Sequence, residues 1–281
     1  MTHIAYLGTG LLGSGFVEAA AKRGERIAVW NRTEDKACSL ERFGVRVADT
    51  PADAVRGATR VHVVLKDDAV VEQVLAAARP GLGQDTIIVD HTTTQPKLTA
   101  DRSARLIASG VRYIHCPVFI GPAAARKGLG TILASGPRDL FDAVKPALSA
   151  MAERVEYFGE RADLAAIYKL SGNAFIIGVT ALAADVFALA SSSGLAATDA
   201  LRVLDFLNPT AMINSRGKAM IAHNYEPGFE IAMARKDVRL MIETAGDKPL
   251  AALPGIAARM DHIIAEGRGA DDLAVIGKDS V

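Results

Sequence analysis

Residues His3–Thr33 read HIAYLGTGLLGSGFVEAAAKRGERIAVWNRT, and this stretch decides the fold. It opens with a short apolar run that predicts a buried parallel strand. The pattern G-x-G-x-x-G follows, over Gly8, Thr9, Gly10, Leu11, Leu12 and Gly13. An amphipathic helical pattern and a second apolar run, Arg26–Trp30, come next. This order predicts a dinucleotide-binding βαβ unit, in which the glycines form a tight turn and free N–H groups at the helix start hold the pyrophosphate.

The residues after the second strand indicate which nucleotide binds. An NAD site usually places Asp or Glu about 20 residues after the glycines, to hold the ribose hydroxyls. Here the chain has Trp30-Asn31-Arg32-Thr33, without a carboxylate. Arg32 can pair with a 2′-phosphate, and Asn31 and Thr33 can add neutral hydrogen bonds. We therefore expect NADP(H) as the cofactor; the alternative is a glycine turn beside a solvated arginine.

Composition narrows the class of protein. The chain has 281 residues, half of them apolar, and its 32 basic residues balance its 32 acidic ones. A neutral chain has no net attraction to nucleic acid or to an anionic membrane, so neither is an expected partner. Cys38, Cys116 and the six histidines lack metal-ligand spacing, so no metal is expected. Nothing resembling a signal peptide precedes Ile4, and we expect a cytoplasmic location.

The pattern changes near residue 160. Before it, apolar runs alternate with helical patterns, which predicts a mostly parallel sheet covered by helices on both faces. Residues 161–193 contain no proline and few charges, which predicts one long helix that needs a partner on every side. Its stretch 173–184 is too short to span a bilayer. The expected fold class is α/β, with a Rossmann domain at 1–160 and an all-helical substrate and dimerisation domain at 161–281, assembled as a homodimer.

The remaining elements follow from the same periodicities. The expected strands after the βαβ unit are 61–65, 86–90, 111–114, 131–134 and 155–158. The expected helices are 33–42, 67–78, 95–108, 138–151, 161–193, 198–207, 213–222, 231–245, 249–266 and 270–276, with Thr50 capping a further helix that Pro51 opens.

Several motifs together resemble the β-hydroxyacid dehydrogenase family over nearly the whole chain. They are the opening glycines with Asn31-Arg32-Thr33, the run Asp90-His91-Thr92-Thr93-Thr94-Gln95-Pro96, the pair Lys169 and Asn173, and Lys236-Asp237. Members of this family join a Rossmann domain to an all-helical domain and interconvert small 3-hydroxy acids and the matching aldehydes with NAD or NADP. The resemblance implies an NADP-dependent dehydrogenase or reductase that acts on a small carbonyl compound or its alcohol.

The resemblance also implies roles for three side chains. Lys169 would exchange a proton with the substrate oxygen, Asn173 would position the substrate, and Lys236 would lie beside the nicotinamide. Residues 169 and 173 project from one face of the long helix, among small residues. A lysine in such a setting loses its proton more easily, as acid–base chemistry near neutral pH requires. The alternatives are a structural ion pair for Lys169, for example with Asp237, and a solvated charge for Lys236.

Two strand ends add residues that should border the cofactor. Leu65 and Lys66 end one expected strand, and Thr92 and Thr93 follow the next. Ligands in open parallel sheets bind beyond the carboxyl ends of the strands. For the threonines, the alternative is capping of the helix that Pro96 opens.

One loop departs from the family pattern. Where the family has D-A-P-V-S-G-G, this chain has His115-Cys-Pro-Val-Phe-Ile-Gly121. Phe119, Ile120 and Gly121 are expected to line the substrate pocket, where apolar bulk replaces two contacts to a substrate carboxylate. The related imine reductases share the architecture and an apolar cleft but usually replace the lysine, so Lys169 favours carbonyl or alcohol chemistry over an imine reductase-like activity. A non-catalytic NADP-binding sensor or scaffold is the remaining alternative.

Overall fold

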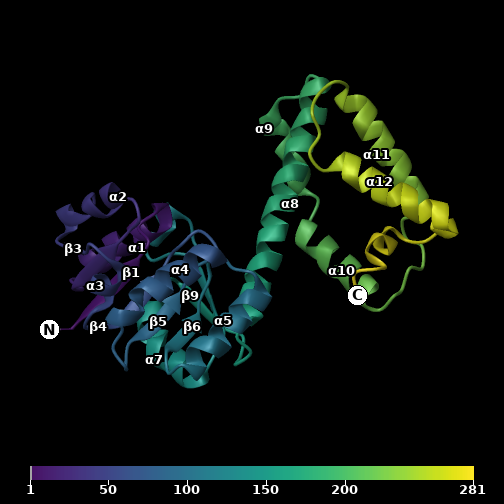
Figure 1. The fold of residues 1–281 in the computed structure, drawn as a ribbon. Helices are drawn as coiled ribbons and strands as arrows, with labels where there is room; N and C mark the ends of the chain where they lie inside the picture. The colour runs from purple at the N-terminus through teal and green to yellow at the C-terminus, as the bar shows by residue number, and fades with distance from the viewer. Residues whose placement is uncertain (1) are drawn as a thin grey trace. The chain divides into compact units, whose positions relative to one another are not determined.

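The computed structural model of the chain describes residues 2–281, and they form two compact units. The first unit ends at Asn173 and the second is Ala174–Val281. The division therefore falls inside one helix, α8 (Leu164–Ser192), whereas the sequence pattern places it after residue 160, ahead of that helix (Figure 1). The first unit is α/β and the second is helical, which confirms the predicted fold class.

A six-stranded parallel sheet organises the first unit. Its strands are β1 (His3–Leu7), β2 (Ile27–Trp30), β3 (Arg46–Val47), β4 (Ala58–Val63), β5 (Ile87–Asp90) and β6 (Arg112–His115). They pair in the order β3-β2-β1-β4-β5-β6. The strand order reverses at β1, which is where ligands of open parallel sheets bind. The glycine turn follows β1 directly and therefore lies at this switch point.

Helices cover both faces of this sheet. They are α1 (Leu11–Lys22), α2 (Glu34–Cys38), α3 (Pro51–Val55), α4 (Asp68–Ala78), α5 (Pro96–Ala108), α6 (Pro122–Ala125) and α7 (Arg138–Ser149). Successive side chains of a strand point to opposite faces, so Tyr6 and Leu7 of β1 enter different apolar clusters. Both are fully buried, and the sheet has a core on each side.

The last strands of the first unit form a second, smaller sheet. β7 (Val118–Phe119) pairs antiparallel with β8 (Thr131–Ala134), which pairs parallel with β9 (Arg154–Tyr157). The prediction of one sheet that includes residues 131–134 and 155–158 is therefore wrong. Pro117 explains the break, because it has no N–H with which to continue the ladder beyond β6, and its carbonyl accepts from the N–H of Leu133 instead.

Several predicted helices are shorter than expected. The predicted helix 33–42 is divided into α2 and a 3₁₀ turn, Glu41–Phe43, and 198–207 becomes α9 (Ala197–Ala200) with a second 3₁₀ turn. The predicted helix 249–266 begins as α12 (Leu253–Ile263). Proline is disfavoured beyond the first turn of a helix, so Pro254, the second residue of α12, disfavours an earlier start. The predicted helix 270–276 is replaced by a 3₁₀ turn, Leu273–Gly277.

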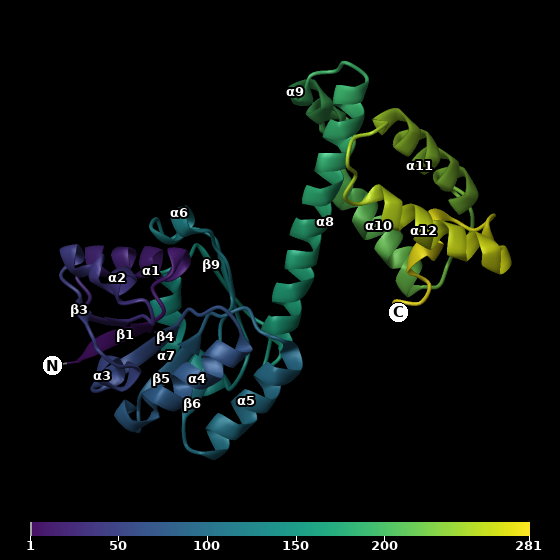
Figure 2. The same cartoon turned by 45° about the horizontal axis from the view of Figure 1, so that its top comes forward.

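The second unit packs its core between α11 (Ile231–Ala245) and α12, which lie side by side in both views (Figures 1 and 2). It also contains α10 (Pro209–Ile221) and the later part of α8. Asp185 of α8 is fully buried and accepts from the N–H groups of Ala251, Ala252 and Leu253 at 2.6–2.9 Å. Burial raises the pKa of Asp185, but these three hydrogen bonds outweigh it and hold the pKa below its usual value. Asp185 therefore fixes α8 to the start of α12.

Most of the apolar surface of α8 is uncovered. By length and composition alone, the helix is long and apolar enough to cross a membrane. Its 18-residue apolar stretch has a mean hydropathy of 2.0, and only 11% of that stretch is buried. Phe175, Ile177 and Val179 are each more than half exposed. The prediction that α8 forms the buried core of a helical domain is therefore wrong for this chain alone, because the neighbouring helices cover only a small part of it.

Candidate active site

The carboxyl ends of β1, β2, β4 and β5 surround a pocket of about 600 Å³. It is lined by all the cofactor residues predicted in the first unit: Gly8, Gly10, Leu11, Leu12, Gly13, Asn31, Arg32, Thr33, Leu65, Lys66, Thr92 and Thr93. Three polar lining residues were not predicted: Lys36, Gln73 and His91. Lys36 lies in the first turn of α2 (Glu34–Cys38), which follows Arg32 closely, and this short separation is the signal that the sequence analysis missed.

The glycine turn has the shape that a dinucleotide requires. Gly8 has a φ of +101°, and a Cβ there would lie 2.2 Å from the carbonyl oxygen of Val64. A Cβ on Gly13 would lie 2.1 Å from the carbonyl oxygen of Gly8, whereas one on Gly10 would meet no atom within 4 Å. Gly10 provides no side-chain cap for α1. The first N–H groups of α1 are therefore open to a phosphate, and the residues present fit NAD(P).

At the end of β2, Asn31 has a structural role. Its Oδ1 accepts from the N–H of Thr9 at 3.0 Å, and its Nδ2 donates to the carbonyl of Thr33 at 2.8 Å. Asn31 thus braces the glycine turn, and only part of its hydrogen-bonding capacity remains for a nucleotide. Arg32 and Lys36 are exposed, and neither has an ion-pair partner among residues 2–281. Two cations are therefore available at this end of the pocket.

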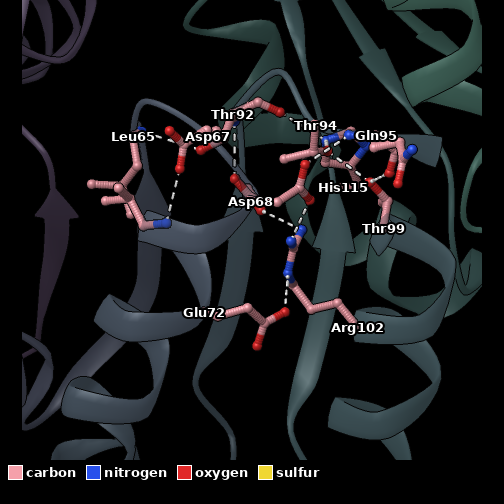
Figure 3. A network of polar contacts seen from close by, with 12 residues as sticks. Leu65, Asp67, Asp68, Glu72, Thr92, Thr94, Gln95, Thr99, Arg102 and His115 are labelled. Atoms are coloured by element: carbon pink, nitrogen blue, oxygen red, sulfur yellow. Dashed lines mark hydrogen bonds and ion pairs between the residues drawn. The ribbon is translucent and has the colours of Figure 1, made fainter. Parts of the chain in front are cut away.

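Beyond β5, the threonine loop is held by buried polar groups (Figure 3). Thr92 donates its N–H to Asp90 Oδ1 at 2.9 Å, and its Oγ1 accepts from the N–H of Leu65 at 3.1 Å. The capping alternative for Thr92 and Thr93 is wrong, because α5 is preceded by Gln95 and has no side-chain cap. Both threonines instead border the pocket.

A row of hydrogen bonds passes from Arg60 to the loop after β6. Arg60 Nε–H can only donate, so its 2.8 Å contact makes His62 Nε2 an acceptor. His62 Nδ1–H then donates to His91 Nε2 at 2.9 Å, and His91 Nδ1–H donates to the Cys116 carbonyl at 2.7 Å. Burial lowers the pKa of His91 to about 4 and that of His62 as well. His91 is therefore neutral near pH 7 and connects the pocket to Cys116.

Lys169 and Asn173 meet on the first turns of α8, as their spacing predicts. Lys169 Nζ donates to Asn173 Oδ1 at 2.9 Å and lies 4.1 Å from the centroid of the Phe119 ring. Lys169 is only 8% exposed, and burial lowers its pKa. Among residues 2–173 it has no ion pair, so within its own unit the structural ion-pair alternative finds no partner.

The Phe119 ring lies directly over Gly172. A Cβ on Gly172 would lie 2.2 Å from Cζ of Phe119, so only glycine leaves room for the ring. Of the other predicted pocket residues, Ile120 packs against the first apolar cluster and Gly121 is exposed ahead of α6. Phe119 is therefore the member of this loop that faces Lys169.

The loop that carries Phe119 also touches the cofactor helix. α6 follows Phe119 closely and packs on α1, where a Cβ on Gly15 would lie 2.9 Å from the Pro122 carbonyl oxygen. One segment thus contacts α1 through α6 and Lys169 through Phe119. Because α1 begins at the pocket, this segment connects Lys169 to the nucleotide site.

The last predicted site residue lies in the second unit. Lys236 Nζ is 2.9 Å from Oδ1 of Asp237, and both side chains are partly exposed. This contact agrees with the solvated-charge alternative. Its place beside the nicotinamide stays a prediction.

Comparison with known proteins identifies the family. Residues 3–159 match the NAD-binding domain of 6-phosphogluconate dehydrogenase, and residues 164–277 match the NAD-binding domain of NADP-dependent 3-hydroxyisobutyrate dehydrogenase. The chain belongs to the β-hydroxyacid dehydrogenase family. It is an NAD(P)-dependent oxidoreductase, as the sequence analysis predicts.

Similar proteins span different functions. An uncharacterized oxidoreductase of Shewanella frigidimarina is 30% identical, over 87% of this chain and 86% of that protein. Glyoxylate/succinic semialdehyde reductase 1 of Arabidopsis thaliana is 26% identical, over 91% and 89%. The cytokine-like nuclear factor N-PAC of Anopheles gambiae is 28% identical over 96% of this chain, which spans 49% of that protein.

Among solved structures, a reductive aminase from Aspergillus terreus has the same fold. Its TM-score is 0.88 at 24% identity, with 100% of this chain and 99% of that chain covered.

Proposed function

We propose that the chain is an NADP(H)-preferring reductase or dehydrogenase in which Lys169 exchanges a proton with the oxygen of a small carbonyl compound or its alcohol. The observation that carries this proposal is the buried pair of Lys169 and Asn173, with 2.9 Å between Nζ and Oδ1. A buried lysine with a lowered pKa suits acid–base work near neutral pH. The glycine turn supports a nucleotide on the same unit.

The geometry suggests how the proton moves. The pocket at the glycine turn would hold NADP(H), which would supply the hydride for the carbonyl carbon in reduction and take it up in oxidation. An ammonium has three donors, and Asn173 Oδ1 takes one, so Lys169 keeps others for the substrate oxygen. In reduction Lys169 gives a proton to that oxygen, and in oxidation the neutral amine takes the hydroxyl proton. Asn173 orients Nζ for this transfer.

Phe119 supports a neutral substrate. Its ring covers one side of the Lys169 ammonium and offers no donor, so an anion beside Lys169 would meet apolar carbon on that side. Apolar walls with a few convergent polar groups are typical of sites for less charged ligands. We therefore favour neutral carbonyl compounds and their alcohols over small hydroxy acids.

Arg32 and Lys36 support NADP(H) over NAD(H). Both line the pocket at the end where the sequence lacks the ribose-binding carboxylate. An arginine can bind a phosphate with two parallel hydrogen bonds, and a lysine adds a point charge.

The uncovered face of α8 supports a homodimer. The helix exposes Phe175, Ile177 and Val179, and the second unit also exposes Phe206. A bilayer is the competing partner. Residues 170–184, between the charged Lys169 and Asp185, would span only ~22 Å at 1.5 Å per residue, less than the roughly 30 Å hydrocarbon core. A second copy of the chain is therefore the favoured partner, and we also propose a cytoplasmic location.

Arg32→Ala should reduce the preference for NADPH over NADH. Loss of a charge-assisted contact of about 1.5–3 kcal/mol corresponds to roughly tenfold to a hundredfold weaker NADPH binding, with NADH little changed. Fluorescence titration of both nucleotides measures this. Arg42→Ala, an arginine ahead of β3 that does not line the pocket, is the control. An Arg32→Ala protein that retains the wild-type preference would contradict the assignment.

Lys169→Ala should abolish turnover while NADPH still binds, because general acids contribute about 10²–10⁴-fold. Reduction needs the ammonium, so its rate should fall as pH rises through the lowered pKa of Lys169, and oxidation should show the reverse dependence. Steady-state rates across pH, with exposed Ser171→Ala as the control on the same helix, test this. More than half of the wild-type rate in Lys169→Ala would show that the lysine is structural.

Phe119→Ser should raise activity on glyoxylate and succinic semialdehyde relative to neutral aldehydes and ketones. Gly172→Ala should act in the same direction, because its methyl group displaces the ring. Gly178→Ala is the matched control, since a Cβ there meets nothing within 4 Å. The screen includes cyclic imines, whose preferential reduction would favour the imine reductase alternative. Robust turnover of the two acids by the unmodified protein would contradict this view of Phe119.

Light scattering of the purified protein should give a homodimer at micromolar concentration without detergent. Ile177→Lys, which places a charge on the exposed apolar face of α8, should shift the protein towards monomer. Lys145→Ala, on α7 of the first unit, is the control. A monomer, or a protein that requires detergent, would exclude the second copy as the partner of α8.

A further inference from the structure

Arg102 is a fully buried cation on α5 (Figure 3). Its guanidinium contacts carboxylates from two other elements. Nη2 donates to Asp68 Oδ1 at 2.5 Å, and Nε donates to Glu72 Oε1 at 2.8 Å, both on α4. Nη1 lies 3.8 Å from Oδ2 of Asp90, at the end of β5. Arg102 thus joins α4, α5 and the sheet.

Two of these carboxylates hold the loop that borders the pocket. Asp90 is fully buried, and its Oδ1 accepts from the N–H of Thr92 at 2.9 Å. Asp68 Oδ2 accepts from the N–H of Gln95 at 2.9 Å. Both ends of residues 92–95 are therefore hydrogen bonded to carboxylates that share Arg102.

The loop at Thr92 also holds the loop at Leu65. Thr92 Oγ1 accepts from the N–H of Leu65, and Leu65, Lys66, Thr92 and Thr93 all line the pocket. Arg102 does not line it. Its effect on a bound nucleotide must pass through Asp68, Asp90 and the backbone of these loops.

Removal of Arg102 would leave Asp90 buried without the cation that it faces. Asp90 would keep only the hydrogen bonds from the Thr92 N–H and the Tyr113 hydroxyl. A buried carboxylate without a facing cation is costly, so Asp90 would move towards water, which weakens its hold on the Thr92 N–H. The position of the loop at Thr92 therefore depends on whether Asp90 faces a cation.

We propose that Arg102 is a positioning residue for the cofactor, which sets the Thr92 and Leu65 loops against NAD(P) through Asp68 and Asp90. The pairing is particular to Arg102. Arg105, about one turn later on α5, shares Glu72 but is largely exposed and pairs with neither aspartate. The inference concerns nucleotide binding alone and is independent of the roles proposed for Lys169 and Phe119.

The test compares Arg102→Met with Arg105→Met, two variants that remove the same charge from one helix. Fluorescence titration gives the Kd of NADPH, and thermal unfolding gives Tm. We expect Arg102→Met to raise Kd about tenfold, by analogy with the loss of groups that orient metal ligands, and Arg105→Met to leave it within about twofold. An Arg102→Met protein that has a lower Tm but the wild-type Kd would overturn the proposal, since Arg102 would then serve stability alone.

Asp68→Asn provides a second route if Arg102→Met does not fold. It keeps the contact between Arg102 and Asp90 but weakens two contacts of Asp68, the ion pair with Arg102 and the hydrogen bond from the N–H of Gln95. We expect a smaller rise in Kd, with a folded protein by circular dichroism. An unchanged Kd in Asp68→Asn would overturn the link through Gln95 and with it the proposal in this form.

Discussion

The close approach of three backbone segments at Gly8 is the constraint on which the first unit depends. The carbonyl oxygen of Val64 lies where a side chain of Gly8 would be, and the carbonyl oxygen of Gly8 lies where a side chain of Gly13 would be. This contact places the helix start against the ends of β1 and β4, so that unpaired N–H groups open into the pocket. Asn31 then fixes the turn to β2 through the N–H of Thr9. The nucleotide site is therefore formed by backbone geometry, and side chains mainly hold it in place.

Two networks of hydrogen-bonded polar groups are buried in the same unit as this turn. The histidine row reaches the Cys116 carbonyl, and the Arg102 cluster holds the loop at Thr92. Such groups are costly to bury unless paired, which makes their arrangement more specific than apolar packing. Both networks end at segments that border the pocket or carry Phe119. The histidine row and the Arg102 cluster thus both support loops at the carboxyl ends of the strands.

The sequence predicted what depends on local periodicity and missed what depends on distant partners. The βαβ unit, the pocket-lining residues and the contact between Lys169 and Asn173 follow from spacing along the chain. The separate sheet of β7, β8 and β9 depends on which strands meet after Pro117, and no local pattern records that choice. The same holds for Arg102, whose partners lie about 12 to 34 positions away. Nucleotide preference, assembly and cellular location stay predictions.

Two opposing effects act on the protonation of Lys169, its burial and its contact with the Phe119 ring. Burial favours the neutral amine, whereas the face of an aromatic ring attracts the ammonium by about 0.5–2 kcal/mol. Asn173 also favours the ammonium, because its Oδ1 accepts a hydrogen bond from it. The ring can keep this position only because Gly172 has no side chain. A glycine on α8 and an aromatic residue on β7 thus act together, and on the proposed mechanism they help to set how readily Lys169 gives up its proton.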